Sequence, residues 1–146
     1  MRISKQGEYG LTAILYLASQ PVGKLSLRDE IARRCGIPRG FLAQILARLR
    51  KGGILGSRRG AHGGYFLRVE PQRLSLADVL QALEGGLLLQ RSVDDLPVEP
   101  LNGEAGVRDS REALRRLQER GLELFRSIKI GEFLSAKSAQ SSEGFI

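Results

Sequence analysis

The 146-residue sequence predicts a mainly α-helical fold with one small β-hairpin and a long C-terminal helix. Three observations carry this prediction. Residues 26–51 show two short runs of helical periodicity separated by a tight turn. Residues 55–68 contain two short strand-like runs joined by a glycine-rich connection, as in a hairpin. Residues 109–134 repeat apolar positions in threes and fours, as in one long amphipathic helix. This order predicts an α+β winged helix-turn-helix, followed by a helix suited to dimerisation.

The first predicted helix covers residues 4–19. Its expected core face is formed by four apolar residues at helical spacing: Leu11, Ile14, Leu15 and Ala18. Gly7 and Gly10 lower its intrinsic helix propensity, but each permits close packing of a neighbouring helix. Pro21 and Gly23 are expected to end it.

The two motif helices have clear end signals. Ser26 and Asp29 have capping-box spacing at the start of the first helix, and Gly36 is placed to end it in a left-handed turn. Pro38 can open the second helix, where its missing N–H has no intrahelical partner. The expected core stripe of this second helix is Leu42, Ile45, Leu46 and Leu49.

The opposite face of the second motif helix carries small, amide and basic side chains: Arg39, Gly40, Ala43, Gln44, Ala47, Arg48 and Lys51. Small residues allow close approach to a DNA duplex, and Gln and Arg can donate to base edges or phosphates. The alternative is a solvated surface over a core, because basic amphipathic helices are common in that role. The hairpin that follows favours the DNA-binding interpretation.

The predicted hairpin pairs residues 55–59 with residues 65–68. Gly60, Gly63 and Gly64 can supply the positive φ values of a tight connection. Basic side chains flank it, namely Arg58, Arg59 and Arg68, and His62 lies near its tip. A phosphate-cradling loop is disfavoured because no P-loop Lys-Ser/Thr or dinucleotide-binding spacing follows.

Charge is distributed unevenly within the net +7. Residues 1–75 hold 14 Lys and Arg against 4 Asp and Glu, a balance of +10, whereas residues 76–146 hold 9 against 12, a balance of −3. A basic N-terminal half with this motif indicates a nucleic-acid binder, with double-stranded DNA as the expected partner. No apolar run suggests a signal peptide or a membrane span, and a single cysteine suits a reducing compartment, so a cytoplasmic location is expected.

An enzyme is not expected, because no nucleophile, base and orienting residue come together in the sequence. His62 is the only histidine, too few for a metal site or a Ser/His/Asp relay. Asp94 and Asp95 are adjacent carboxylates, and we interpret them as part of a solvated acidic loop.

The C-terminal part begins with a second capping box, Ser75 and Asp78, ahead of a short helix that Gly85 and Gly86 stop. We divide the chain into a winged domain (1–84), a loop (85–108), a dimerisation helix region (109–134) and a polar tail (135–146). Asp109 or Ser110 is expected to cap the long helix. Its predicted dimer seam is Leu114, Leu117, Gly121, Leu124, Phe125 and Ile128.

Three stretches together resemble one known family: ISKQGEYGLTAILYLA, SLRDEIARRCGIPRGFLAQILARLRKGGILGSRRGAHGGYFL and LSLADVLQALEG. They are similar to the Rrf-two family of bacterial transcription regulators, of the IscR, NsrR and CymR type. The specific features are an arginine and Gly-Gly-Tyr at the wing, followed by Leu-Ala-Asp at residues 76–78. The resemblance covers residues 1–86 closely and the long helix in pattern.

The resemblance implies a homodimer on a pseudo-palindromic operator, with the long helix crossing to the partner. We expect the protein to act as a repressor. The recognition helix is then Arg39 to Lys51, and Arg59 heads the wing, where the family uses an arginine in the minor groove. Ala43 stands where many members have a polar or acidic residue, and His62 where Gly or Pro is common. The predicted DNA-binding set is Arg28, Arg39, Gly40, Ala43, Gln44, Arg48, Lys51, Arg58, Arg59, His62 and Gly63.

Iron–sulfur members of the family hold a cluster with three loop cysteines. Here Ser92, Val98 and Glu104 stand about where those thiolates would be sought, and Glu8 lies where some members have an extra carboxylate ligand. Clusters depend on thiolates. We therefore predict no cluster, no other cofactor and no metal, with Glu8 as a solvent-facing or salt-bridged residue.

Two alternatives remain open at the level of sequence. Cys35 lies beside Arg33 and Arg34, whose charge could lower its pKa and make it a redox-sensing thiol; otherwise it fills a helix end. The winged fold could also serve as a protein-interaction module with the acidic loop as its surface. A small-molecule or protein effector is not identified by the sequence.

Overall fold

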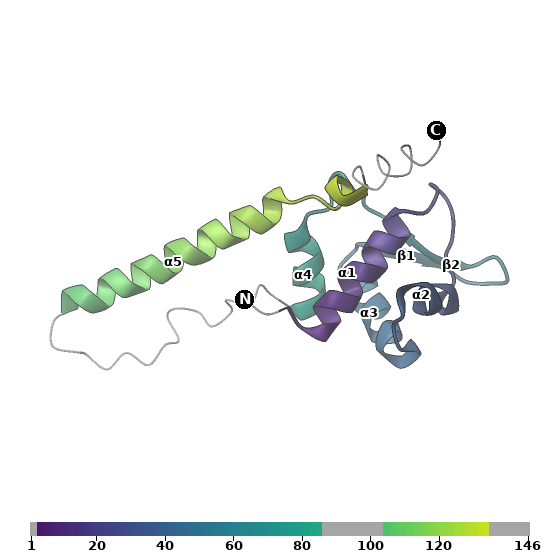
Figure 1. The fold of residues 1–146 in the computed structure, drawn as a ribbon, viewed down its shortest axis with the longest axis horizontal. Coiled ribbons are helices and arrows are strands. Elements are labelled where there is room, and N and C mark those ends of the chain that lie inside the picture. The colour runs from purple at the N-terminus through teal and green to yellow at the C-terminus, as the bar shows by residue number, and fades with distance from the viewer. Residues whose placement is uncertain (1–2, 86–103, 135–146) are drawn as a thin grey trace, which may run out of the picture.

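The computed structural model describes residues 3–85 and 104–134, with side chains of the last helix described from Glu112 onward. The elements are α1 (Lys5–Ala18), α2 (Arg28–Cys35), α3 (Arg39–Lys51), β1 (Leu55–Arg58), β2 (Gly64–Leu67), α4 (Leu76–Glu84) and α5 (Glu104–Ser127). Figure 1 shows α1 to α4 and the hairpin gathered into one body, from which α5 extends as an arm. The predicted mainly helical fold with a small β-hairpin is confirmed.

The core of the body is formed where four helices meet the hairpin. Each contributes fully buried aliphatic side chains, including Ile14 of α1, Ile31 of α2, Leu42 of α3 and Leu83 of α4. Burying one such side chain stabilises the fold by about 1.5–3 kcal/mol. The predicted stripe of α3 is wholly buried, as its spacing required.

Two glycines of α1 let α4 pack against it closely, as predicted. A Cβ at Gly10 would lie 2.3 Å from Leu83 Cδ1, and one at Gly7 would lie 2.6 Å from Glu84 Oε1. Glu84 also accepts hydrogen bonds from the backbone N–H and the hydroxyl of Ser4, while the Ser4 hydroxyl caps α1 by accepting from the Gly7 N–H at 3.1 Å. The start of α1 is therefore fixed to the end of α4.

The predicted cap of α2 is wrong. Ser26 does not cap the helix; it pairs with β2, since its N–H donates to the Tyr65 carbonyl at 3.0 Å and its carbonyl accepts from the Tyr65 N–H at 2.8 Å. This strand-like pairing fixes the Ser26 backbone and buries its side chain completely. The residue at the N-cap position is Leu27, which has no side-chain cap bond. The other end agrees with prediction, because Gly36 has a φ of 65°.

A polar cluster ties α1 to α2. The Tyr16 hydroxyl donates to Glu30 Oε1 at 2.7 Å, and Lys24 Nζ donates to the same oxygen at 2.8 Å. These hydrogen bonds, first from Lys24 and then from Tyr16, lower the pKa of Glu30. The Glu30 hydrogen bond in turn raises the pKa of Lys24 and the pKa of Tyr16. The cluster therefore holds the α1–α2 connection with a charged carboxylate.

The wing is a two-stranded antiparallel sheet. Its register pairs Leu55 with Leu67, Gly56 with Phe66, Ser57 with Tyr65, and Arg58 with Gly64. Because directly opposed residues share a face, Leu55 and Leu67 face the core while Phe66 lies over Gly56 on the outer face. β1 ends one residue before its predicted end, and β2 is shifted by one residue toward the N-terminus.

α4 begins as predicted, with both bonds of the Ser75–Asp78 capping box formed. The segment after α5 pairs with the chain just before α4. The Leu76 N–H donates to the Ile128 carbonyl and the Ile130 N–H donates to the Leu74 carbonyl, each at 2.9 Å. Ile130 is fully buried beneath this joint.

α5 begins at Glu104, five residues before the predicted start at Asp109. A helix interior tolerates Gly106 at a cost of about 1 kcal/mol, and an acidic residue at the first position suits the helix dipole. α3 begins at Arg39, one residue later than expected, because Pro38 occupies the N-cap position and not the first position inside the helix. The rest of the predicted loop (residues 86–103), including Ser92, Asp94, Asp95 and Val98, and the polar tail (135–146) lie outside the described residues.

Candidate nucleic-acid interface

The face of α3 opposite the core is available to a ligand. Gly40, Gln44, Ala47 and Lys51 recur at helical spacing and are all exposed. Gly40 has no atom near its virtual Cβ, so its surroundings are open. The face thus has a flat centre with one amide and one ammonium group, which a groove of DNA can approach closely.

At the N-terminal end of α3, an ion pair connects the two motif helices α2 and α3. Arg39 Nε lies 3.5 Å from Asp29 Oδ1 of α2, and both side chains are largely exposed. An exposed pair of this kind contributes little stability, about 0–1 kcal/mol. It holds the Arg39 guanidinium beside α2, whose first residue, Arg28, is also exposed.

Arg48 lies differently from the prediction. Its Nη1 donates to the Leu83 carbonyl at 2.8 Å, so the guanidinium is directed to the end of α4. That carbonyl is near the C-terminus of α4, where the helix dipole favours a cation. The position is explained by geometry, because Arg48 lies on the same side of α3 as Phe41 and Gly52, which contact α1 and α4. Arg48 thus positions α3 against α4.

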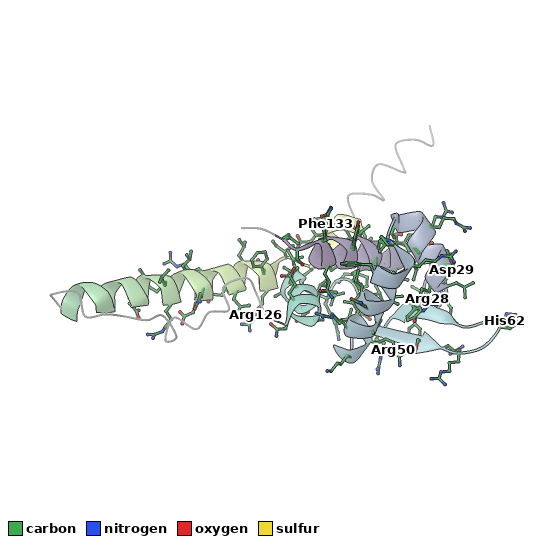
Figure 2. All side chains as sticks on the ribbon, turned by 90° about the horizontal axis from the view of Figure 1, so that it is seen from below. Arg28, Asp29, Arg50, His62, Arg126 and Phe133 are labelled. Carbon is green, nitrogen blue, oxygen red and sulfur yellow. The ribbon has the colours of Figure 1, made fainter. Side chains whose placement is uncertain are left out.

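Arg50 is a basic residue of this surface that the sequence reasoning missed. It is exposed and follows Ala43 by seven residues, two helical turns, so the two share a side of α3. That spacing was the signal that could have found it. In Figure 2, Arg50 and Arg28 lie toward the end of the molecule from which the wing projects, with His62 at the wing tip.

The conformation of the wing loop depends on glycine. Gly60 and Gly64 have the predicted positive φ, 109° and 149°, but the prediction is wrong for Gly63, which is needed for close approach instead: a Cβ there would lie 2.2 Å from the Arg58 carbonyl oxygen. The Gly63 N–H donates to the Gly60 carbonyl at 2.9 Å and closes the turn. This tight loop carries Arg59 and His62 on exposed backbone, and Arg58 precedes it.

Cys35 does not have the environment that its neighbours suggested. It is half-buried against the core, and this burial raises the pKa of its thiol. The alternative in which Arg33 and Arg34 lower that pKa is not supported, because both side chains are exposed to water, which screens their charges. This burial disfavours the thiolate, which is the reactive form of cysteine.

The residues present do not fit an iron–sulfur cluster. The whole sequence contains one cysteine, Cys35, at the end of α2. Glu8, the other residue considered, is exposed and lies 3.2 Å from Lys5 Nζ. Within residues 3–85 and the described side chains beyond, no three His, Cys, Asp or Glu side chains gather as a metal site would require. A thiolate-held cluster lacks its ligands here.

The geometry of this interface agrees with the comparisons. The family model described as "Rrf2: Iron-dependent Transcriptional regulator" matches residues 3–136. The chain belongs to the Rrf2 family. Rrf2 proteins are transcriptional regulators and not enzymes.

Individual Rrf2 relatives agree with this assignment. The HTH-type transcriptional regulator IscR of Klebsiella pneumoniae is 33% identical over 138 residues, which cover 92% of this chain and 80% of IscR. Rv1287 of Mycobacterium tuberculosis is 38% identical over 99 residues, 66% of this chain and 62% of Rv1287, so less than two thirds of that relative is spanned. The structure of CymR, the global cysteine regulator of B. subtilis, matches with a TM-score of 0.72 at 31% identity, covering 93% of this chain and 98% of CymR.

The fold of this chain is therefore that of a winged-helix Rrf2 regulator. None of the helices in the described part of the chain is long and apolar enough to cross a membrane.

Proposed function

We propose that this chain is a homodimeric repressor that binds a pseudo-palindromic operator in double-stranded DNA and acts in the cytoplasm without an iron–sulfur cluster. The observation that carries the proposal is the shared location of the exposed face of α3 and the glycine-closed wing. In this arrangement Gln44 reads base edges in the major groove, while Arg59 reaches the minor groove or a phosphate.

The remaining members of the DNA-binding set have supporting roles. Gly40 and Ala43 allow close approach, and Lys51, Arg58 and Arg50 neutralise phosphates. Arg28 and Arg39 contact the backbone at the start of the two motif helices. His62 and Gly63 shape the wing tip. We remove Arg48 from the set because its guanidinium is bonded to α4.

The arm formed by α5 supports a dimer. Leu114, Leu117 and Leu124 are 41%, 58% and 59% exposed, so much of the apolar seam has no cover within the described chain. Gly121, Phe125 and Ile128 continue the seam and are partly buried. A second copy is the partner that fits, because an identical seam buries both sets of leucines at once and brings two recognition helices to one operator.

Absence of the cluster follows from the donor set. A protein purified without oxygen should show no visible absorption from iron–sulfur charge transfer and no stoichiometric iron. A coloured, iron-loaded protein would contradict this part of the proposal without affecting DNA binding.

Selection from a random duplex library tests DNA recognition directly. The full chain should enrich a pseudo-palindrome whose half-sites lie about one helical turn, or a multiple, apart. The Gln44→Ala and Arg59→Ala variants serve as matched controls that keep the fold. If no sequence is enriched and all duplexes bind alike, the specific regulator is excluded and a protein-interaction module becomes the better explanation. A thiol switch at Cys35 has less support, since burial raises the pKa of Cys35.

A further inference from the structure

A pocket of about 390 Å³ lies on the side of the wing, away from the recognition face of α3. Its walls are the end of α1, the connection between α1 and α2, and the hairpin together with the residues that follow β2. The connection runs alongside β2 because Ser26 is paired with Tyr65. The size is within the range of pockets that hold small molecules.

The lining of this wing pocket is mainly apolar. Leu17 comes from α1, Leu25 from the connection, and Phe66 and Val69 from β2 and its continuation. Val22 stands at the pocket with its side chain completely in solvent. Such a surface gains from a ligand with an apolar body, because that ligand removes it from water.

The polar part of the lining is positively charged. Lys24 is neutralised by Glu30 at 2.8 Å, and Glu70 is neutralised by Arg73 at 3.6 Å. Arg58 and Arg68 also line the pocket, and neither makes an ion pair with any described residue. By strand register both lie on the outer face of the hairpin, on either side of Phe66. Two uncompensated guanidinium groups therefore flank an aromatic ring.

This combination specifies the chemistry of an occupant. Planar guanidinium groups bind carboxylates and phosphates through paired N–H donors, and a carboxylate is the smaller of the two anions beside an apolar body. The volume accommodates a body of about a dozen non-hydrogen atoms, taking about 30 Å³ for each water-sized atom. An aromatic or branched apolar body can pack on Phe66 and Val69 while its carboxylate lies between the arginines.

We infer that the wing pocket is the effector site of this protein and binds a small amphipathic carboxylate between Arg58 and Arg68. The regulatory part rests on the proposed function, in which Arg58 contacts a DNA phosphate. A carboxylate bound to Arg58 through paired N–H donors offsets its positive charge and occupies donors that would otherwise contact the phosphate. The carboxylate therefore weakens operator binding and relieves repression.

The binding step is tested on the free full-length chain with 3-phenylpropionate as the probe. Titration followed by amide NMR should shift the signals of Leu25, Phe66 and Val69 with one saturable constant. The uncharged isostere 3-phenylpropanamide should bind about tenfold more weakly, and Arg68→Gln should lose a similar factor for the acid only. Arg33→Gln is the matched control, since it removes an exposed charge outside the pocket.

Three results would overturn the site. One is no saturable shift with the probe, a second is equal affinity for acid and amide, and a third is equal loss in Arg68→Gln and Arg33→Gln. Val22→Asp provides an independent check. It places a negative charge at the pocket on a side chain that packs against nothing, so it should weaken the acid without unfolding the protein.

The regulatory step is measured separately by operator titration. Saturating 3-phenylpropionate should lower the affinity of the parent for its selected operator about fivefold or more, the loss of one charged contact. Arg68→Gln should still bind the operator but no longer respond to the probe. If the free protein binds the acid but operator affinity does not change, the regulatory claim is wrong. If no operator is found at all, the proposed function fails, while the NMR titration still decides the pocket.

Discussion

At the scale of single residues, two buried serines have opposite environments. Ser75 is satisfied on both sides by its capping box with Asp78. Ser26 is fully buried, and its hydroxyl has no hydrogen-bond partner among the described residues. A buried polar group without a hydrogen-bond partner destabilises the folded state, whereas a helix cap stabilises it.

We therefore expect alanine to act in opposite directions at the two serines. Ser26→Ala should raise the free energy of unfolding by up to about 1 kcal/mol, because it removes an unsatisfied hydroxyl. Ser75→Ala should lower it by about 1 kcal/mol, because it removes a cap. Urea unfolding of both variants gives the two values. Destabilisation by Ser26→Ala would show that its hydroxyl has a partner.

The cluster around Glu30 gives the protein an acid-sensitive contact. Its hydrogen bonds with Lys24 and Tyr16 lower the pKa of Glu30, so the stability it contributes is present above the ordinary glutamate pKa and is lost as pH falls through the lowered value. Unfolding measured between about pH 6 and about pH 3 should show the parent losing its advantage over Glu30→Gln. Glu70→Gln serves as a control, because it removes a carboxylate from an exposed ion pair. A constant difference across this range would exclude the linkage.

At the scale of elements, α3 has one face that we propose contacts DNA and another side that contacts α4. Gln44→Ala should reduce the preference for operator over random duplex by about 1–3 kcal/mol, the range for a base-edge contact. Arg48→Ala should leave that ratio nearly unchanged but weaken the attachment of α3 to α4, and so lower stability. Binding titrations with both duplexes, beside thermal unfolding, separate the two effects. If the ratio of operator to random-duplex affinity changes in Arg48→Ala but not in Gln44→Ala, the DNA-facing side of α3 has been assigned wrongly.

The salt dependence of DNA affinity can identify the kind of contact that we propose for Arg59 in the wing. If Arg59 neutralises a phosphate, Arg59→Ala should lower the slope of log affinity against log salt concentration by about one. If it lies in a narrow minor groove, the preference for A·T-rich flanks should change as well. Replacing Arg126, on α5 and far from the wing tip in Figure 2, should alter neither property. Insensitivity of both properties to Arg59→Ala would remove the wing from the interface.

Sequence predicted those elements whose signals are local. The buried stripe of α3, Gly36 as helix end, the Ser75–Asp78 box and the glycine-closed hairpin all depend on residues close together in the chain. Contacts between residues distant in the sequence were not predicted. Tyr65 pairs with Ser26, which therefore does not cap α2, and the Leu83 carbonyl accepts a hydrogen bond from Arg48. Burial of Cys35 against the core, which raises its thiol pKa, also depends on distant residues. No spacing rule along the sequence contains these contacts.

At the scale of the whole molecule, the proposed dimer through α5 would bring two winged domains to one operator. Replacing Leu117 and Leu124 together with aspartate puts two unpaired charges into the exposed seam, where burial is costly. The variant should sediment as a monomer with its winged domain folded, since that core lies elsewhere. It should also lose most of its affinity for the full operator but little for a half-site.

Replacement of Glu112 and Glu119 with glutamine, on the same helix, gives a control with altered charge and an intact seam. A dimer that survives both aspartates would place the interface on another element. A monomer that binds the full operator as tightly as the parent would show that pairing is not needed for recognition.

The joint between α4 and the segment after α5 has a mechanical consequence. The arm is held at its base by three backbone hydrogen bonds, from the N–H groups of Leu76, Ile130 and Gly131, around the bridge of Ser75 with Lys129. With 24 residues at about 1.5 Å each, the arm is about 36 Å long, so a tilt of about 10° at the base displaces its far end by about 6 Å. The joint is thus the point about which the arm would rotate. In the dimer that we propose, small rotations at this joint would change the spacing of the two winged domains along the double helix.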